Sequence, residues 1–266
     1  MSTAPHNSLA LALDGMSSPV RFFVRDDDAG WADERLLALL AVMADVGVPV
    51  DLAAIPDAVT PALARELLLR QRGQALGIHQ HGCRHTNHEF AERKCEFGAA
   101  RSVHQQQADL VHGRKVLQAL FPVGLDPLFT PPWNRVGADT PAILAALGFT
   151  ALSRDITAPA QLALPEISVH TDWSKLWRLA QGQVAAESLA LDLARHVREG
   201  ACIGLMLHHA EMSDAELEAL RALLTTFGRH PMARWILMHQ VMEDMPMPEP
   251  DRRTGRTLAH SNEASV

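Results

Sequence analysis

Short apolar runs and amphipathic helical segments alternate about seven times along this chain. The apolar runs predict buried strands at residues 20–24, 50–55, 75–78, 128–130, 149–153, 166–170 and 202–207. Helices are expected to begin near residues 33, 61, 102, 140, 184 and 213, and 234–238 is a last strand or helical turn. Strands that alternate with helices pair in parallel, so the pattern predicts an α/β fold whose sheet is open or closed into a barrel.

The domain organisation expected from 266 residues is a single domain, because this length suits one α/β barrel and no linker interrupts the pattern. Residues 1–19 are polar and aperiodic and are predicted to form a flexible arm. The barrel is expected over 20–244. The proline-rich, charged segment 245–266 is predicted to be disordered.

Composition excludes several classes of function. A formal net charge of −7 argues against a nucleic-acid or anionic-membrane partner. The only apolar piece near the N-terminus, Leu9 to Leu13, is too short for a signal peptide or membrane span, so the cytoplasm is expected. Three cysteines at unpatterned spacing argue against a disulfide framework, and nothing in the sequence indicates an oligomeric state.

Polar clusters stand where five of the predicted strands end. They read VRDDDAG (24–30), IHQHGCRHTNH (78–88), FTPPWNR (129–135), VHTDW (169–173) and GLMLHH (204–209). Parallel barrels gather side chains from several strands at this face, so the clusters favour a barrel. No glycine-rich phosphate loop follows a strand, which argues against a nucleotide fold.

The second cluster contains four histidines within ten residues: His79, His81, His85 and His88. Two histidines and one carboxylate are enough to hold a catalytic Zn²⁺ or a similar ion. The aspartates at 26–28 supply that carboxylate and a second one, which can take a proton from water. A late histidine can then protonate the leaving group. The pattern therefore indicates a metal-dependent hydrolase.

In order and content these clusters resemble the motifs of the polysaccharide deacetylase, or NodB-homology, family (carbohydrate esterase family four). The family has TFDDG on its first strand, a histidine pair spaced HxxxH after its third, an R-x-P-Y/W motif, a DxxDW motif and a final L-H. The resemblance covers roughly residues 22–209. It implies a distorted (β/α)7 barrel with its site at the C-terminal strand ends, and metal-dependent removal of acetyl groups from sugars.

The resemblance implies one divalent ion, Zn²⁺ first and Mn²⁺, Co²⁺ or Ni²⁺ as alternatives, held by Asp28, His81 and His85. Asp27 is implied as the catalytic base. The aspartate triplet also leaves open a register shifted by one residue, with Asp26 and Asp27 in these roles. His79 remains a substitute ligand, because it shares a strand face with His81.

The general acid implied by the final L-H is His208, oriented by Asp172, with His209 as the alternative. Substrate contacts are assigned to Trp133, Pro132, Trp173 and Arg135, and Trp133 serves either as a sugar platform or as a core lid. The chain departs from the family at Thr130, where an arginine commonly orients the base. Arg25 or Arg135 is the candidate replacement.

The resulting hypothesis is a cytoplasmic metal-dependent deacetylase that acts on an N- or O-acetyl group of a small-molecule or glycan substrate. One alternative is hydrolysis of a non-peptide C–N bond in another small amide. The other is a catalytically silent barrel that binds a glycan or a protein.

Overall fold

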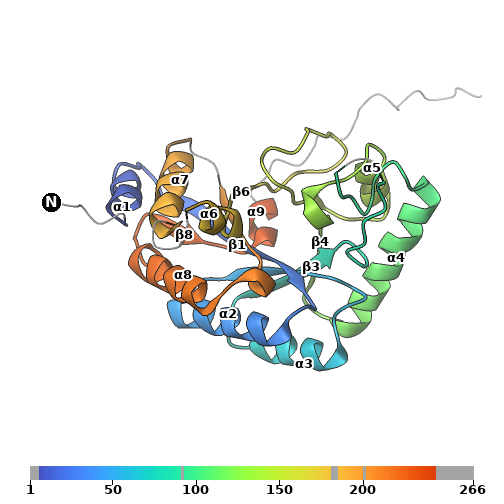
Figure 1. The fold of residues 1–266 in the computed structure, drawn as a ribbon, viewed down its shortest axis with the longest axis horizontal. Coiled ribbons are helices and arrows are strands. Elements are labelled where there is room, and N and C mark those ends of the chain that lie inside the picture. Colours follow the sequence, from blue (N-terminus) through green and yellow to red (C-terminus); the bar gives the residue numbers. More distant parts are fainter. Residues whose placement is uncertain (1–5, 91–92, 181–184, 200–201, 244–266) are drawn as a thin grey trace, which may run out of the picture.

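The computed structural model describes residues 6–90, 93–180, 185–199 and 202–243 and shows a curled sheet wrapped by helices (Figure 1). All strand pairs are parallel, in the order β5-β4-β3-β2-β1-β7-β6, and β8 adds to the start of β1. The strands are β1 Val20–Ala29, β2 Val50–Ala54, β3 Leu76–His81, β4 Leu125–Thr130, β5 Ala151–Leu152, β6 Val169–Asp172, β7 Ile203–Leu207 and β8 Ala233–Trp235.

The two edge strands, β5 and β6, do not form a continuous ladder with each other. They approach through an isolated bridge between Asp155, which follows β5, and Val169 at the start of β6. The sheet is therefore curled nearly into a closed ring, and the prediction of a single-domain distorted (β/α)7 barrel is confirmed.

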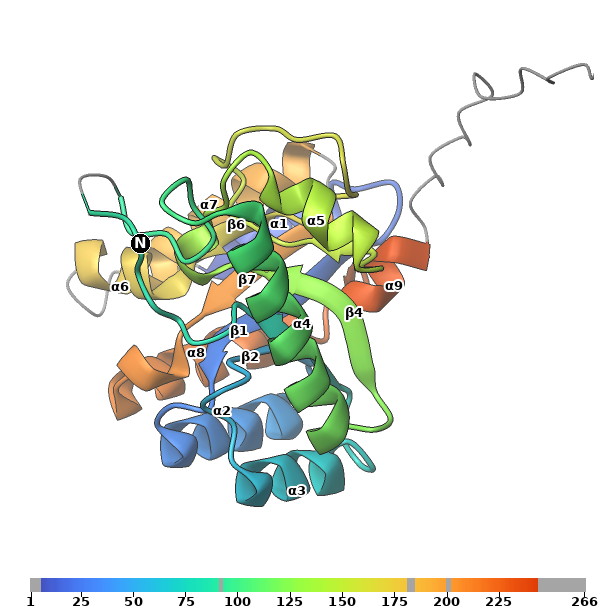
Figure 2. The ribbon, with the colours of Figure 1, turned by 90° about the vertical axis from the view of Figure 1, so that its right-hand side faces the viewer.

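Helices α2, α3 and α4 follow one another along the outside of the curled sheet, α8 lies beside α2, and α1 packs against α7 and α8 (Figures 1 and 2). Two of them, α4 and α8, begin with capping boxes formed by Ser102 with Gln105 and by Ser213 with Glu216. The helices are α1 His6–Asp14, α2 Asp33–Val46, α3 Pro61–Arg70, α4 Val103–Leu120, α5 Thr140–Ala146, α6 Trp173–Ala180, α7 Ala185–Glu199, α8 Asp214–Phe227 and α9 Met238–Glu243.

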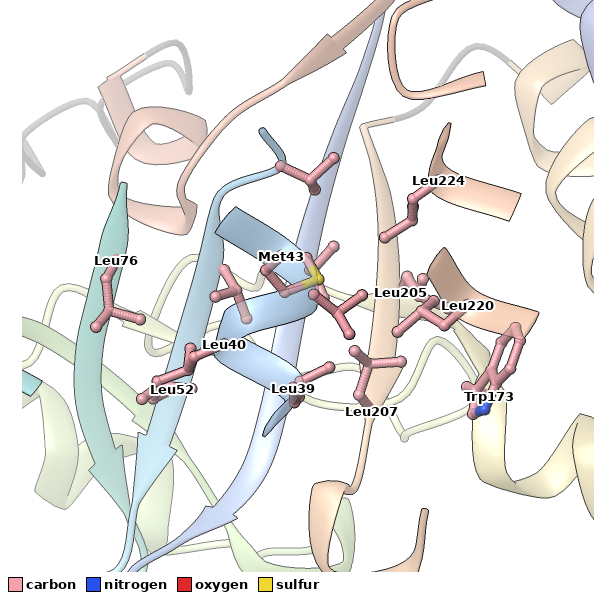
Figure 3. Packing of buried hydrophobic residues seen from close by; sticks show 14 of the residues in the cluster. Leu39, Leu40, Met43, Leu52, Leu76, Trp173, Leu205, Leu207, Leu220 and Leu224 are labelled. Atoms are coloured by element: carbon pink, nitrogen blue, oxygen red, sulfur yellow. The ribbon is translucent and has the colours of Figure 1, made fainter. Parts of the chain in front are cut away.

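The main core lies between the central strands and the helices α2 and α8 (Figure 3). Leu39, Leu40 and Met43 recur at helical spacing on α2 and are fully buried against the sheet. Leu220 and Leu224 do the same on α8, facing β7. These contacts fix the positions of the central strands, whose C-terminal ends carry the polar clusters.

One sequence prediction about the elements is wrong, and one helix was missed. The predicted flexible arm contains α1, whose Leu9 and Leu13 lie four residues apart on one helix face and are fully buried, with α7 and α8 beside the helix. Helix α6 was not predicted, and it starts directly at Trp173. The predicted disordered tail, 245–266, lies outside the described residues. No helix among the residues described is long and apolar enough to cross a membrane.

Candidate metal centre and catalytic site

Three side chains from β1 and from the end of β3 bring their ligand atoms together. Asp28 Oδ1 lies 3.2 Å from His81 Nε2 and 3.2 Å from His85 Nε2. All three ligand atoms fall within 4.8 Å of one another. Asp28 Oδ1 is also buried and has no hydrogen-bond partner. A buried carboxylate oxygen without a partner is costly, and a cation bound between the three groups would satisfy it.

The protonation of the His81 ring suits metal binding. His81 Nδ1 lies 3.0 Å from the carbonyl oxygen of Thr130, which can only accept, so Nδ1 carries the proton. In its neutral form, this ring presents the lone pair of Nε2 toward Asp28, as in metal sites whose histidines donate their other N–H to a carbonyl. One carboxylate oxygen and two imidazole nitrogens are a ligand set that fits a divalent transition metal.

Charges at the triad respond to burial and to one another. Burial raises the pKa of Asp28, but the facing His81 and the nearby His85 and His208 lower it to about 2. Burial and the charge of His81 lower the pKa of His85 to about 4. Burial also lowers the pKa of His81, but Asp28 and Asp27 raise it by a larger amount. The pKa of His81 therefore lies above its ordinary value. The carboxylate therefore stays ionised and available as a ligand.

Unusual backbone conformations aim these side chains. Asp28 has φ 71°, and the register between β1 and β2 shifts between Asp26 and Ala29, which marks a bulge. The bulge breaks the alternation of the strand, so Asp28 can join the site beside Asp27. His85, Trp133 and Asn134 also have φ 57°, so four of the five described non-glycine residues with positive φ lie at this site.

The loop between the two histidine ligands is held by Glu96. Its buried carboxylate accepts the backbone N–H groups of Cys83 at 3.1 Å and Arg84 at 2.8 Å. Gly82, with φ 57°, packs so closely that an added Cβ would lie 2.1 Å from Glu96 Oε2. Glu96 thus positions the turn that carries His85. The sequence analysis did not identify it.

A cation lies beside Asp27, and it comes from Arg25 rather than from position 130, where the resemblance predicted an arginine. Its guanidinium binds Asp27 through Nε to Oδ1 at 2.8 Å and Nη2 to Oδ2 at 2.9 Å. It also donates to Ser153 Oγ at 2.7 Å and to Asn134 Oδ1 at 2.8 Å. Burial raises the pKa of Asp27, but Arg25 and the neighbouring histidines lower it by more, so Asp27 is an ionised, oriented carboxylate.

Thr130, at the position where the resemblance predicted an arginine, contacts two histidines of β3. Its carbonyl receives His81 Nδ1–H, and its Oγ1 lies 2.8 Å from His79 Nε2. His79 is fully buried, and burial together with the charge of Arg25 lowers its pKa to about 3. His79 is therefore a neutral ring behind the strand end and lies outside the group of three metal-ligating side chains.

The two consecutive late histidines have different surroundings. His208 Nε2 lies 3.9 Å from Asp27 Oδ2 and faces the site. His209 is fully buried, with Nδ1 2.6 Å from Asp26 Oδ2 and Nε2 2.7 Å from the carbonyl oxygen of Trp31. Asp26 is thus engaged by His209, which favours Asp27 and Asp28 over the shifted register for the site.

The predicted pairing of Asp172 with His208 is not formed. Asp172 Oδ1 accepts the backbone N–H of Lys175 at 3.0 Å, and His208 Nδ1 has no hydrogen-bond partner. The reason is local: β6 ends at Asp172 and α6 begins at the next residue, so the carboxylate caps the first turn of the helix. His208 therefore lies at its strand end with Asp27 beside it.

The aromatic and proline predictions divide between the core and a cavity. The His85 ring packs edgewise against Trp31 and Trp133, at centroid distances of 4.8 Å and 4.5 Å. Trp133 and Arg135 line a cavity of about 970 Å³ beside the metal triad. Trp173, in contrast, is fully buried and stacks on Trp177 at 5.8 Å, so its assignment to substrate binding is wrong.

Pro132 is also wrongly assigned to substrate binding. It is buried, and its ring lies over Gly82, where an added Cβ would approach it to 2.7 Å. It does not line the cavity beside Trp133. Pro132 therefore packs against the loop that joins the two histidine ligands.

A second group of possible ligands, Asp57, Cys83 and His112, lies away from this centre. Both carboxylate oxygens of Asp57 are already engaged, Oδ1 by His112 at 2.7 Å and Oδ2 by Arg84 at 2.9 Å. Burial raises the pKa of the Cys83 thiol to about 12, which opposes formation of the thiolate that binds metals. This group has the character of a surface ion-pair network.

Comparison with known proteins gives similarity in structure alone. No protein-family model and no curated protein sequence matches this chain. A candidate polysaccharide deacetylase from Mycobacterium smegmatis is similar in structure, with a TM-score of 0.62 and 16% identity over 86% of this chain and 91% of that one. A family 4 carbohydrate esterase from Streptomyces lividans has a TM-score of 0.55 and 14% identity over 80% and 90%.

A third similar structure is a Bacillus anthracis protein named as a pseudoenzyme of carbohydrate esterase family four. Its TM-score is 0.56, with 13% identity over 85% of this chain and 66% of that one. The chain therefore has the fold of the polysaccharide deacetylases, as the resemblance predicted. Since that fold also carries a pseudoenzyme, activity has to be argued from the site.

Proposed function

We propose that this protein is a metal-dependent deacetylase that removes an N- or O-acetyl group from a sugar or glycan precursor. The observation that carries the proposal is the convergence of Asp28, His81 and His85 beside an Asp27 carboxylate held by Arg25. Asp28 Oδ1 is buried without a hydrogen-bond partner and lies next to the oriented carboxylate of Asp27. Such an arrangement costs stability, and a catalytic metal site accounts for it whereas a purely structural barrel does not.

Asp28, His81 and His85 would hold the ion, with Zn²⁺ as first choice and Mn²⁺, Co²⁺ or Ni²⁺ as alternatives. When bound, a divalent cation polarises a carbonyl and lowers the pKa of coordinated water. The protein supplies an ionised ligand in Asp28, two imidazole lone pairs, and ring contacts of Trp31 and Trp133 that orient the His85 imidazole.

Two separate proton transfers would be carried out by Asp27 and His208, whose Oδ2 and Nε2 atoms lie 3.9 Å apart. Asp27 takes a proton from the water that adds to the acetyl carbonyl carbon, and the bidentate contact with Arg25 keeps its carboxylate aimed. His208 then protonates the departing amine nitrogen or alkoxide oxygen as its bond to the carbonyl carbon breaks. The products are acetate and the free amine or alcohol.

The test combines metal content with acetate release. Purified protein should contain one divalent ion per chain, and the loaded protein should release acetate from at least one acetylated amino sugar. Asp27→Asn should retain the metal and lose the release, because the base is gone and the ligands remain. If the loaded protein hydrolyses only cyclic or other non-sugar amides, or binds metal and releases nothing, the proposal is wrong.

A further inference from the structure

The Arg25 guanidinium reaches across the inside of the barrel from β1 to the far edge of the sheet. Its Nη1 donates to Oγ of Ser153 at 2.7 Å, and Ser153 follows directly after β5. In the strand order, β5 stands at one edge, with β4, β3 and β2 between it and β1. Both side chains are buried. The residue that aligns the Asp27 carboxylate is therefore itself held from the opposite wall of the barrel.

The direction of the hydrogen bonds at Ser153 is fixed. Its hydroxyl has one hydrogen, and the carbonyl oxygen of Ile167, 2.7 Å from Oγ, can only accept. A guanidinium can only donate, so Ser153 gives its proton to Ile167 and receives Nη1–H from Arg25. A continuous chain of bonds thus joins the Ile167 carbonyl to the Asp27 carboxylate through Ser153 and Arg25. Bonds in such a chain polarise and strengthen one another.

Ser153 lies at the seam where the two edges of the sheet meet. On one side of it, the N–H of Ile167 donates to the carbonyl oxygen of Leu152 at 2.9 Å. On the other side, the N–H of Val169 donates to the carbonyl oxygen of Arg154 at 2.8 Å. These bonds join the end of β5 to the segment that leads into β6. The position of the Ser153 hydroxyl is therefore set by the closure of the barrel.

The Nη1 group of Arg25 depends on this hydroxyl. Within the described part of the chain, Ser153 Oγ is the one acceptor of Nη1, whereas Nη2 donates to Asp27 Oδ2 at 2.9 Å and to Asn134 Oδ1 at 2.8 Å. Loss of the hydroxyl would leave a buried guanidinium N–H without a partner, which is costly and favours rotation toward another acceptor. The carboxylate of Asp27 would then lose part of its alignment.

We propose that Ser153 is a positioning residue of the proposed deacetylation, because its hydroxyl ties Arg25 to the seam between β5 and β6 and so couples closure of the barrel to alignment of the base Asp27. The inference rests on the proposed function and adds a residue that belongs to none of the sequence motifs. Ser153 does not line the cavity beside Trp133. Its loss should therefore lower kcat and leave KM and the metal content unchanged.

Steady-state kinetics of the zinc-loaded protein, with oligomers of N-acetylglucosamine as the probe, test the effect on the reaction. Ser153→Ala should lower kcat by about tenfold or more, because a small misplacement of a catalytic group is costly, and KM should stay within about twofold. Ser153→Thr keeps the hydroxyl and should recover most of the lost kcat. A rise in KM in place of the fall in kcat would assign Ser153 to substrate binding and overturn the inference.

The matched control is Thr171→Val, which also removes a buried hydroxyl bond near the seam. Thr171 lies on β6, and its Oγ1 donates to Asp192 Oδ2 at 2.6 Å, outside the chain of bonds that leads to Asp27. This variant should keep the native kcat. Circular dichroism and chemical denaturation of each variant report separately on folding.

NMR signals of the arginine guanidinium groups test the contact itself, without reference to activity. In the zinc-loaded native protein the hydrogens on Nη1 and Nη2 of Arg25 should exchange slowly with water, because they are buried and hydrogen-bonded, and Arg25→Lys identifies their signals. Their exchange should accelerate by about tenfold or more in Ser153→Ala. It should stay at the native rate in Thr171→Val.

These measurements separate the inference from the proposed function. Equal changes of kcat in Ser153→Ala and Thr171→Val, or native exchange of the Arg25 hydrogens in Ser153→Ala, would overturn the positioning role and leave the deacetylase in place. A native protein that releases no acetate from any acetylated sugar would refute the deacetylase. The exchange rates would then still decide whether Ser153 holds Arg25.

Discussion

Arg25 and Asp27 lie two residues apart on β1 and meet in a buried, two-bonded ion pair, with Nε–Oδ1 2.8 Å and Nη2–Oδ2 2.9 Å. Residues at this spacing share one face of a strand, so the base and the group that aligns it come from a single three-residue segment. A planar guanidinium with two parallel bonds fixes both the position and the plane of the carboxylate.

Arg25→Met should therefore lower kcat by about a hundredfold or more, because the base loses its alignment. It should also move the acidic limb of the pH–rate profile to higher pH, since Arg25 lowers the pKa of Asp27 and its loss raises that pKa. Arg25→Lys keeps the charge and loses the second bond, so its limb should move less. An unchanged limb in Arg25→Met would show that Asp27 is not the titrating base.

Removing one member of the triad should remove the metal. Asp28→Asn retains a side chain that tolerates positive φ, so the fold should persist while the metal content falls from one ion per chain toward zero. Added Zn²⁺ should raise the Tm of the native protein and leave that of the variant unchanged.

The matched control for the triad is His88→Ala, because His88 contacts Arg101 at 3.0 Å near the surface and lies outside the triad. Its metal content should equal that of the native protein. Elemental analysis gives the answer directly, and metal retained in Asp28→Asn would remove this aspartate from the ligand set.

The buried pair of His209 and Asp26 should make stability depend on pH. Burial lowers the pKa of His209, but the charge and hydrogen bond of Asp26 raise it to about 9 from the ordinary 6.5. A raised histidine pKa stabilises the fold fully below pH 6.5, and this stabilisation is lost as pH rises through about 9. The shift corresponds to roughly 3 kcal/mol.

Urea unfolding of the native protein and of His209→Gln at several pH values in this window isolates the contribution of His209, because the raised pKa of His81 contributes to both curves. The free energy of unfolding of the native protein should fall more steeply between pH 6.5 and about 9 than that of His209→Gln, which should be the less stable of the two at pH 6.5. A native protein equally stable at both ends of the window would contradict the charged state assigned to His209.

Substitution of Trp133 and of Trp173, both assigned to substrate contacts from the sequence, should have different effects. Trp173→Ala removes a fully buried ring stacked on Trp177 and should lower the free energy of unfolding by about 3–5 kcal/mol. Trp133→Ala removes a half-buried ring on the cavity wall and should raise KM by about tenfold with little loss of stability. The reverse pattern in chemical denaturation and steady-state kinetics would exchange their roles.

Much of the fold could be predicted from the sequence, because apolar runs and helical spacing are local patterns that locate strands and helices. The four histidines of residues 79–88 stood out by composition, but the choice of His81 and His85 together with Asp28 came from the family resemblance. Helix α1 was missed because its two buried leucines pack next to α7 and α8, which are distant in the sequence, so no local pattern indicates their burial.

The failures at the site also have physical causes. The sequence left two candidates, Arg25 and Arg135, for the arginine that orients Asp27. The structure distinguishes them, because Arg25 lies on the same face of β1 as Asp27. Glu96 carries no motif at all, because a carboxylate that binds backbone N–H groups imposes no pattern on its neighbours. Asp172 stands at the motif position, but α6 begins at the next residue, so the carboxylate of Asp172 caps this helix instead of binding His208.

The left-handed conformations of Asp28, His85, Trp133 and Asn134 have a consequence for any attempt to stabilise this protein. Each such residue raises the free energy of the folded state by about 1–2 kcal/mol, and glycine would relieve it. Glycine at Asp28 or His85 would also delete a ligand. Selection for a higher Tm in metal-free protein should therefore favour loss of these ligands, whereas selection in the presence of Zn²⁺, which raises the Tm through the triad, should retain them.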